Sequence, residues 1–416
     1  MDRRSFTATV LGVAAAPLLP RIARSADPIR IGLGMAQTGP LAANGKSALV
    51  AMDIWKDDIN AKGGLLGRPV EFVIYDDQSN PSTVPGLYTK LIDVDKVDLV
   101  VSGYGTNVIA PAMPVIIQHN KTFLSLFGLA VNEQFHYPKY FTITPTGPDP
   151  TVSSTVGFFE VGAQQNPAPK TLAIIAADAE YPRASADGVR KNAKKFGWDI
   201  VYDKNYPPTT TDYSPVIRAV QATNPDAVFV ASYPVDTVGI VHAANEVGLK
   251  TKLFGGGMVG LQTTSVKEQL GPLMNGIVNY DFWIPAKTMQ FPGVMDFLKK
   301  YHDKAASSGV DPLGYYLAPW AYTYMQVLAD SVEGAKGLDQ DKIADWMRSH
   351  TFKTVMGDIA FGEDGELSVS HSMMVQFQHV TGNGVDQFQD AKNPIILWPA
   401  KYKDGDALYP YDSAKS

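Results

Sequence analysis

Residues 29–75 read IRIGLGMAQTGPLAANGKSALVAMDIWKDDINAKGGLLGRPVEFVIY, and this stretch sets the pattern for the whole chain. It begins and ends with near-continuous apolar runs, 29–35 and 70–75, of the kind that a parallel sheet buries on both faces. Between them, four apolar residues at spacings of four, three and four form one stripe along 41–61: Ala48, Met52, Trp55 and Ile59. Such a stripe predicts an amphipathic helix whose apolar face packs on the sheet. The stretch therefore predicts a strand, helix and strand unit of an α/β protein.

The alternation of strand and helix continues along the chain in two series. In the first series, apolar runs at 98–102 and 122–126 add two more strands. The second series restarts after the turn-rich stretch TITPTGP at 142–148, which suits a crossover between two units. Its predicted strands lie at 171–176, 200–202, 227–231 and 252–254, and its predicted helices at 182–196, 213–223 and 235–247. Two such series imply two lobes.

A third zone follows the second series. Residues 292–350 have a mostly helical pattern, and residues 357–370 then lead into an alternating strand at 373–377 and a turn at 382–384. The fold class that we predict is therefore α/β, with two lobes that are each a mostly parallel sheet with helices on both faces.

The composition fits a globular chain of two or three compact units. The chain has 416 residues, of which 45% are hydrophobic and 19% are charged. Its net charge is -6 and it contains no basic block, so it lacks the positive surface that binds nucleic acid. The absence of cysteine excludes disulfides, thiolate catalysis and cysteine-ligated metal sites. We expect no nucleic-acid partner and no sulfur-based redox chemistry.

The N-terminus has the order of a bacterial export signal. Arg3 and Arg4 precede an apolar run at 8–19, and a cleavage region then leads to a mature start near Asp27. The paired arginines favour the twin-arginine route. The apolar run, at about 12 residues, is short of the roughly 20 needed to span a bilayer, and no later apolar run approaches that length. We predict a cleaved export signal at 1–26, a periplasmic location and no membrane span. The alternative is an amphipathic N-terminus that lies on a membrane.

Motifs of several enzyme classes are incomplete in this chain. Residues 44–47 end in Gly-Lys-Ser like a phosphate-binding loop, but Gly39 lies one residue out of register for that loop. The Gly-Leu-Gly at 32–34 lacks the third glycine of a dinucleotide-binding turn. The histidines show no metal-ligand spacing, and no serine lies in a GxSxG motif. We predict no catalytic residue, no metal site and no cofactor.

Two adjacent carboxylates, Asp76 and Asp77, follow the second strand of the opening stretch. They could serve acid-base chemistry or bind a cation, or they could cap the turn and helix that follow at the carboxyl edge of the sheet. We favour the structural role, because the turn signal Asn80-Pro81 comes directly after them.

Two neighbouring motifs carry a family resemblance. The run DINAKGGLLGRPV at 58–70, followed by YDDQSNP at 75–81, resembles the branched-chain amino-acid (Leu/Ile/Val-binding) type of periplasmic substrate-binding protein. Gly39-Pro40, NEVGLKT at 245–251 and GDIAF at 357–361 extend the similarity over essentially the whole mature chain. The resemblance implies the type I periplasmic binding fold, in which three crossovers join two lobes and the ligand lies in the cleft between them. It also implies delivery of that ligand to the membrane permease of an ABC transporter.

The resemblance further implies how the chain is divided. Lobe 1 is expected to comprise residues 27–144 and 282–354, and lobe 2 residues 145–281 and 355–400, with a C-terminal tail at 401–416. Closure of two lobes over a ligand needs no second chain, so we expect a monomer. Open α/β sheets bind ligands beyond the carboxyl ends of their strands, and this rule independently favours a site in the cleft.

Loops after the strands supply the predicted ligand-binding residues. The family holds a ligand carboxylate with a small hydroxyl residue in the first of these loops, and Thr106 falls on that position. Phe282, with other aromatic and apolar residues, could form the walls around the ligand. The predicted ligand-binding residues are Tyr104, Thr106, Asn107, Phe127, Leu129, Ala130, Tyr181, Tyr233, Gly257, Met258 and Trp283.

The positions that hold a ligand amino group in the family differ here. The resemblance implies a threonine two residues after Gly128, where this chain has Ala130, and a glutamate where it has Gly257. Leaving a buried ammonium unpaired costs several kcal/mol, a large part of the about 8 kcal/mol of a micromolar affinity. These differences disfavour an α-amino acid as the ligand.

The ligand that we predict is a small carboxylate, an aromatic acid of the benzoate or phenylpropanoid type, whose ring stacks on the aromatic residues. Arg183 could clamp the carboxylate from the second lobe, or it could be a solvated residue at a helix start. A binder of branched-chain amino acids, a binder of short amides or urea, and the ligand domain of a sensor are the alternatives. An enzyme is disfavoured, because the loops offer only Asp178, Asp236 and tyrosines as titratable groups.

Overall fold

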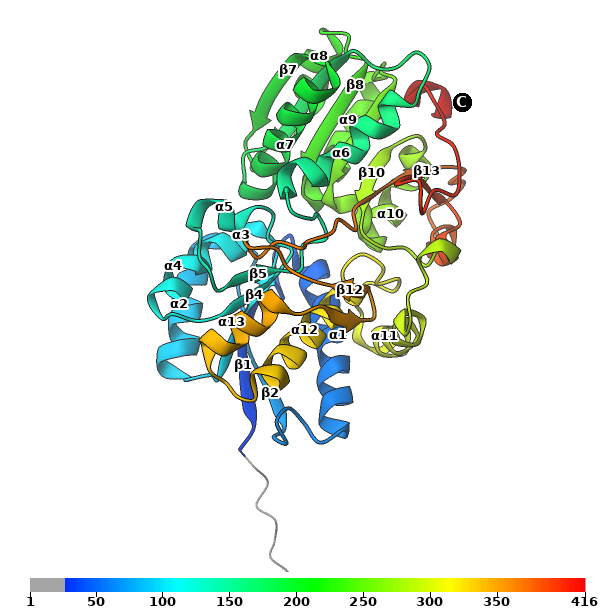
Figure 1. Ribbon diagram of the computed structural model, residues 1–416. Coiled ribbons are helices and arrows are strands. Elements are labelled where there is room, and N and C mark those ends of the chain that lie inside the picture. The colour runs from blue at the N-terminus through cyan, green and yellow to red at the C-terminus, as the bar shows by residue number, and fades with distance from the viewer. Residues whose placement is uncertain (1–26, 416) are drawn as a thin grey trace, which may run out of the picture.

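The computed structural model describes residues 27–415, which form two large β-sheets in two lobes (Figure 1). The predicted export signal at 1–26 lies outside the described residues. The first sheet has the order β2-β1-β3-β4-β5, and all of its strand pairs are parallel. Its strands are β1 (Ile29–Met35), β2 (Val70–Asp76), β3 (Leu99–Tyr104), β4 (Phe123–Leu126) and β5 (Tyr140–Thr142).

The second sheet has the order β14-β13-β10-β9-β8-β6-β7. Its five strands from β10 to β7 run parallel, and β13 and β14 add an antiparallel edge. Its strands are β6 (Thr171–Ala177), β7 (Asp199–Tyr206), β8 (Ala227–Ser232), β9 (Leu253–Met258), β10 (Val278–Asp281), β13 (Met373–Phe377) and β14 (Pro394–Trp398). A separate hairpin pairs β11 (Phe352–Thr354) with β12 (Gly357–Ile359).

Helices cover both sheets, as the alternating pattern predicts. The stripe on α1 is buried at Ala48, Met52 and Trp55, and Ile59 packs against the same core. The helices are α1 (Ala42–Ala61), α2 (Val84–Thr89), α3 (Thr106–Ile109), α4 (Met113–Gln118), α5 (Val131–Phe135), α6 (Pro150–Ala163), α7 (Glu180–Phe196), α8 (Ser214–Gln221), α9 (Pro234–Val247), α10 (Thr264–Leu270), α11 (Val294–Ser308), α12 (Ala318–Ala335) and α13 (Gln340–Ser349). The predicted fold class, an α/β protein with two mostly parallel sheets in two lobes, is confirmed.

The chain passes between the lobes after β5, after β10, and between β12 and β13. Before the last passage it stays against the first sheet, because the N–H of Thr142 donates to the carbonyl of Gly365 at 2.9 Å and the rings of Phe141 and Phe361 lie 5.2 Å apart. The predicted lobe boundaries remain a prediction. These contacts favour a last boundary after Glu366, later than the predicted one at 355.

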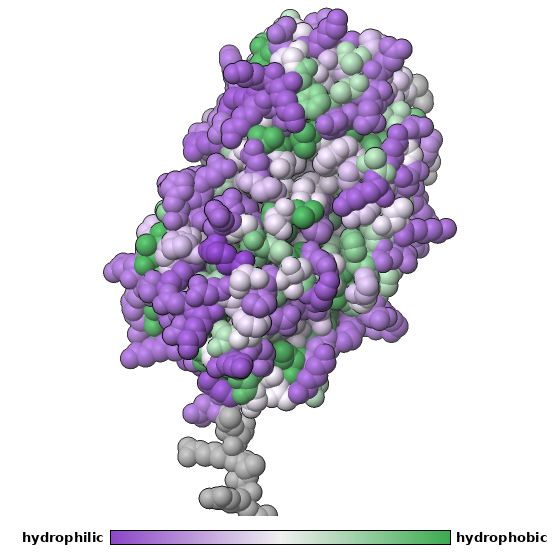
Figure 2. All heavy atoms as spheres, viewed as in Figure 1, coloured by the Kyte–Doolittle hydropathy of each residue, from purple (hydrophilic) through white to green (hydrophobic). Residues whose placement is uncertain are grey.

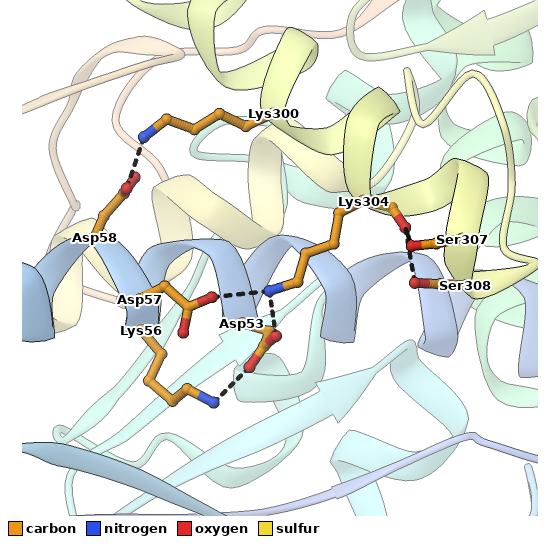
Figure 3. Close-up of polar contacts among 8 residues, drawn as sticks. All are labelled: Asp53, Lys56, Asp57, Asp58, Lys300, Lys304, Ser307 and Ser308. Atoms are coloured by element: carbon orange, nitrogen blue, oxygen red, sulfur yellow. Dashed lines mark hydrogen bonds and ion pairs between the residues drawn. The ribbon is translucent and has the colours of Figure 1, made fainter.

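Helix α11 belongs to the first lobe, and charged residues attach it to α1 (Figure 3). Lys304 of α11 pairs with Asp53 and, at 2.9 Å, with Asp57, while Lys300 pairs with Asp58 at 2.6 Å. Burial by itself raises the pKa of Asp53, but hydrogen bonds from Lys304 and Lys56 outweigh burial and hold that pKa below its ordinary value. The pairs lie at the surface, where ion pairs contribute little each and more as a network.

The outer face seen in Figure 2 carries mainly hydrophilic residues over both lobes, interrupted by small hydrophobic groups. Within residues 27–415, no helix combines the length and the apolar character needed to cross a membrane.

Candidate functional site

A cavity lies between the two lobes, at the carboxyl ends of the parallel strands. Loops after β3 and β4 form its first-lobe wall, and residues from α7, β8, β9 and β10 form its second-lobe wall. Seven of the predicted ligand-binding residues line it: Tyr104, Thr106, Phe127, Leu129, Tyr181, Tyr233 and Gly257. The position agrees with the rule that open parallel sheets place ligands beyond their strand ends.

The cavity carries no formal charge. None of the described residues that line it has a carboxylate, ammonium, guanidinium or imidazole group. Its polar atoms are hydroxyl groups and backbone groups, and Gly257 lies where the resemblance implies a glutamate. A ligand ammonium would find no counter-ion here, so its desolvation would remain uncompensated.

Thr106 begins α3 in the first-lobe wall. The chain enters this helix through Gly105, whose φ of 98° lies in a region that side chains with a Cβ rarely adopt. The hydroxyl oxygen of Thr106 accepts a hydrogen bond from the backbone N–H of Leu129 at 3.0 Å. Because a hydroxyl has one proton and two lone pairs, Thr106 keeps its own proton free to donate to a ligand.

The tyrosines form the polar part of the cavity wall. The hydroxyl of Tyr316 lies 3.3 Å from that of Tyr104 and 3.3 Å from that of Tyr280, and the hydroxyl of Tyr181 donates to the carbonyl of Gly257 at 3.1 Å. Burial raises the pKa of these tyrosines above the ordinary value, so they are protonated at neutral pH.

Aromatic rings form the apolar part of the wall. The ring of Phe127 meets those of Phe282 and Tyr316 edge to face, at centroid distances of 5.1 and 5.4 Å. The rings of Phe282 and Tyr316 are stacked at 5.9 Å. Such a wall favours the binding of a ligand with a flat ring. Each offset or edge-to-face contact between two rings contributes about 0.5 to 1.5 kcal/mol.

Asn107 links the two lobes instead of lining the cavity. Its side-chain oxygen accepts hydrogen bonds from the hydroxyl of Tyr233 at 2.6 Å and from the backbone N–H of Tyr181 at 3.3 Å. Asn107 lies on the first lobe, on α3, and both donors lie on the second. Asn107 borders an outer hollow that reaches Arg183, and Tyr233 lies between this hollow and the inner cavity, because it lines both.

Three further predicted residues are not among those that line the cavity. Met258 is fully buried beside Gly257, and successive residues of a strand face opposite sides of the sheet. Trp283 is also fully buried, and its indole N–H donates to the carbonyl of Met289 at 2.9 Å. Ala130 begins α5 with a left-handed backbone and borders a hollow on the outer surface.

Sequence reasoning missed several residues that line the cavity, and most of them bear hydroxyls or rings. Tyr316 comes from the segment before α12, and Thr144 and Thr146 come from the first passage between the lobes. The hydroxyl of Thr146 is buried and has no hydrogen-bond partner among the described residues. The one available signal was that passages between lobes border the cleft.

The charged residues singled out in the sequence have other partners. Arg183 pairs with Asp178 at 2.7 Å at the surface, and neither lines the inner cavity. Asp236 is bonded to the hydroxyl of Tyr206, and burial raises the pKa of this carboxyl to about 6. In residues 27–415, no three metal-binding side chains of the His, Cys, Asp or Glu type are grouped together.

Two features of the first lobe that resembled functional motifs, the carboxylate Asp76 and the stretch that ends in Gly-Lys-Ser, have structural roles in the fold. Asp76 accepts hydrogen bonds from the backbone N–H groups of Gln37 and Gln78, both at 2.9 Å, and so joins the loops after β1 and β2. Gly45, in the stretch that ends in Gly-Lys-Ser, allows α1 to pass close to Ala36, since a Cβ there would lie 2.0 Å from the Ala36 carbonyl oxygen.

Comparison with known proteins decides the family. Residues 28–382 match the family of periplasmic binding proteins. The chain belongs to the periplasmic binding protein family. Over 344 residues it is 25% identical to the leucine-, isoleucine-, valine-, threonine- and alanine-binding protein of Pseudomonas aeruginosa. The aligned residues cover 82% of this chain and 88% of that protein.

Two solved structures show the same fold. The structure of a leucine binding protein from Thermotoga maritima superposes on this chain with a TM-score of 0.73 and 19% sequence identity. The match covers 85% of this chain and 96% of that protein. The second structure is a solute binding protein of an ABC transporter from R. palustris in complex with 4-hydroxybenzoate. It superposes on this chain with a TM-score of 0.74 and 19% sequence identity, and the match covers 88% of this chain and 95% of that protein. The predicted family and fold are confirmed, and this periplasmic binding protein is a solute-binding protein and not an enzyme.

Proposed function

We propose that this periplasmic binding protein is the solute-binding component of an ABC importer and that it binds an aromatic carboxylate of the benzoate or phenylpropanoid type. The ligand lies in the cavity between the lobes and is enclosed when the lobes close. One observation carries the proposal: the cavity is lined by tyrosine and phenylalanine rings and by hydroxyl groups, with no charged side chain among its described residues.

The two ends of such a ligand match different parts of the wall. The carboxylate meets the free hydroxyl proton of Thr106, with backbone N–H groups at the start of α3 beside it. The ring lies among Phe127, Phe282 and Tyr316, where stacking and burial of apolar area stabilise it.

A branched-chain amino acid is the second candidate, favoured by the name of the Pseudomonas relative and by the leucine binding protein from Thermotoga. An α-amino acid would bury its ammonium beside Gly257 with no acidic side chain to pair with it. The neighbour in complex with 4-hydroxybenzoate supports the aromatic alternative on the same fold. Short amides or urea would fit a neutral cavity but would leave its aromatic walls without contacts.

The test is a thermal-shift screen of the purified mature protein, followed by calorimetry. The ligands are benzoate, 4-hydroxybenzoate, cinnamate, leucine, isoleucine, acetamide and urea. We expect aromatic acids alone to raise the melting temperature, since a ligand at 100 times its Kd stabilises the folded state by about 2.7 kcal/mol. Tight binding of leucine with no response to any aromatic acid would return the protein to the amino-acid branch.

We also propose that the chain is exported with its signal at 1–26 and passes its ligand to a membrane permease as a monomer. Expression of the full chain with periplasmic fractionation and mass measurement tests the export step. We expect a shortened periplasmic form that disappears when Arg3 and Arg4 are both replaced by lysine, because the twin-arginine route requires the arginine pair. An uncleaved cytoplasmic product from the unaltered chain would contradict the export proposal.

A further inference from the structure

Two threonines of the first passage between the lobes line the cavity, and their hydroxyl groups differ in one respect. Thr144 and Thr146 lie two residues apart, and both are almost fully buried, at 3% and 1% exposure. The hydroxyl of Thr144 lies 2.7 Å from that of Thr142, so it has a hydrogen-bond partner. The hydroxyl of Thr146 has no partner within residues 27–415. The two positions therefore form a matched pair, one with a partnered hydroxyl and one with an unpartnered hydroxyl.

A buried hydroxyl without a partner lowers the stability of a folded protein. It has left water with no hydrogen bond in return, and the large majority of buried polar side-chain atoms in native proteins avoid this cost. A threonine hydroxyl carries one proton and two lone pairs, so Thr146 can donate to, or accept from, a group outside the chain. Because Thr146 lines the cavity, a bound ligand is in a position to supply that group.

The backbone around Thr146 connects the cavity with another passage between the lobes. The chain turns tightly here, since the N–H of Thr146 donates to the carbonyl of Thr144 at 2.7 Å. The residue between them is Pro145, whose carbonyl accepts from the N–H of His371 at 2.9 Å and from the hydroxyl of Ser372 at 3.1 Å. Both of these donors belong to the last passage. A ligand bound to Thr146 therefore restrains two of the three passages.

We propose that Thr146 is a ligand-contacting residue, whose hydroxyl forms a hydrogen bond with a polar group of the bound solute and so holds the first passage against the last one while the cleft is closed. The inference rests on the proposed site, the cavity between the lobes, but it does not require an aromatic ligand. Thr106 supplies a hydroxyl from the first lobe, and Thr146 adds one from a passage that moves when the lobes close. Ligand binding and lobe closure are then coupled through one hydrogen bond.

Thermal unfolding of the ligand-free protein is the first test, with Thr146→Val and Thr144→Val as the matched pair of variants. Thr146→Val removes an unpartnered hydroxyl, so we expect its melting temperature to equal or exceed that of the unaltered protein. Thr144→Val takes a hydrogen-bond partner from Thr142, so we expect a lower melting temperature. A lower melting temperature in Thr146→Val as well would overturn the inference, because its hydroxyl would then have a partner within the chain.

Ligand affinity is the second test, by calorimetry with whichever of benzoate, cinnamate and leucine raises the melting temperature most. We expect Thr146→Val to weaken binding at least about fivefold, Thr144→Val to weaken it less, and Thr146→Ser, which keeps the hydroxyl, to bind within a few-fold of the unaltered protein. Unchanged affinity in Thr146→Val would overturn the inference. Binding of leucine alone would overturn the proposed aromatic ligand and still test Thr146. If none of the three binds, the melting temperatures decide on Thr146.

Hydrogen exchange tests the coupling to the last passage, in the presence of the same ligand at saturation. The N–H of His371 donates to the carbonyl of Pro145, so its exchange should slow when the ligand restrains the first passage. We expect the slowing to be at least about threefold smaller in Thr146→Val than in the unaltered protein, and to persist in Thr144→Val. Equal slowing in all three proteins would overturn the coupling, because the ligand would then act on the passages without Thr146.

Discussion

The two walls of the cleft differ in how far they follow the branched-chain amino-acid family. On the first-lobe wall, Thr106, which the resemblance places at the family's carboxylate-binding position, lines the cavity and keeps a proton to donate. On the second-lobe wall, Gly257 lies where the resemblance implies an acidic residue, and the hydroxyl of Tyr181 donates to its carbonyl at 3.1 Å. We therefore propose that the first-lobe wall recognises a carboxylate and that the second-lobe wall determines what the rest of the ligand is. The four predictions below test this division.

Placing an acid on the second-lobe wall should have the largest effect. Gly257→Glu would put a carboxylate beside a bound aromatic acid, and two desolvated like charges oppose each other strongly. We expect affinity for aromatic acids to fall at least about 1000-fold, equivalent to about 4 kcal/mol, by calorimetry.

Gly257→Ala is the control for crowding, because a Cβ at this position would lie 3.1 Å from the ring of Phe229 and from the carbonyl oxygen of Val230. We expect the alanine variant to lose much less affinity than the glutamate variant. Equal losses of affinity in the two variants would show that crowding, and not charge, limits ligand binding at this wall.

Removing the donor from the first-lobe wall should have the next largest effect. In Thr106→Val the ligand carboxylate loses a hydroxyl donor, and the N–H of Leu129 loses its acceptor. We expect binding to weaken by about 1 to 3 kcal/mol, which is about 5-fold to 150-fold. Thr106→Ser keeps the hydroxyl and should bind within a few-fold of the unaltered protein. A serine variant as weak as the valine variant would contradict the prediction, because the hydroxyl alone would then not account for binding.

Breaking the link between the two walls should weaken all ligands alike. Asn107→Ala removes the acceptor that Tyr233 and Tyr181 of the second lobe share when the cleft is closed. Each hydrogen bond contributes about 1 kcal/mol, so we expect the loss of both to give about a thirtyfold loss of affinity with no change in ligand preference. A variant that lost one ligand selectively would show that Asn107 touches the ligand directly.

The smallest effect concerns charges far from the cleft. Asp53 and Asp58 have folded-state pKa values below their ordinary ones, since hydrogen bonds from lysines outweigh the opposing effect of burial. Their stabilisation is therefore complete above the unfolded pKa near 4 and is lost as the pH falls through the lower folded pKa.

We expect Asp53→Asn and Asp58→Asn to lower the free energy of unfolding at pH 7 by at most about 1 kcal/mol each in urea titrations, and by less at pH 3. Asp303→Asn, at the exposed pair with Lys299, is the control and should change little. None of the three should alter ligand affinity, and a change there would contradict the separation of cleft from surface.

Most of the fold follows from patterns that are local in the sequence. The strands β1 and β13 begin and end at the predicted residues, and α1 differs from its prediction by one residue. The strands are apolar runs that the sheet buries along nearly their whole length, and the helix has a periodic apolar stripe, so each leaves a signal in the sequence. The strand β5 has only three residues and β14 begins with a proline, and both were missed because a very short run and a proline weaken the strand signal.

The cavity is harder to predict, because it depends on which way each residue faces. A loop after a strand brings Thr106 to the cleft, and the chain order alone suffices to place it. Met258 follows Gly257 directly in β9, but only Gly257 is among the residues that line the cavity. Tyr316 reaches the cavity from a segment without a strand, so only the three-dimensional arrangement reveals it.

The two passages that return the chain late to each lobe have a consequence for how the protein is made. As the chain leaves the ribosome, the strands of the first sheet emerge by residue 142, but α12, which packs against α1 and β4, follows only at 318–335. The second sheet likewise lacks β13, the neighbour of β10, until residue 377. A nascent chain that ends before α12 therefore exposes apolar surface in both lobes, and folding must wait for contacts between segments synthesised far apart in time.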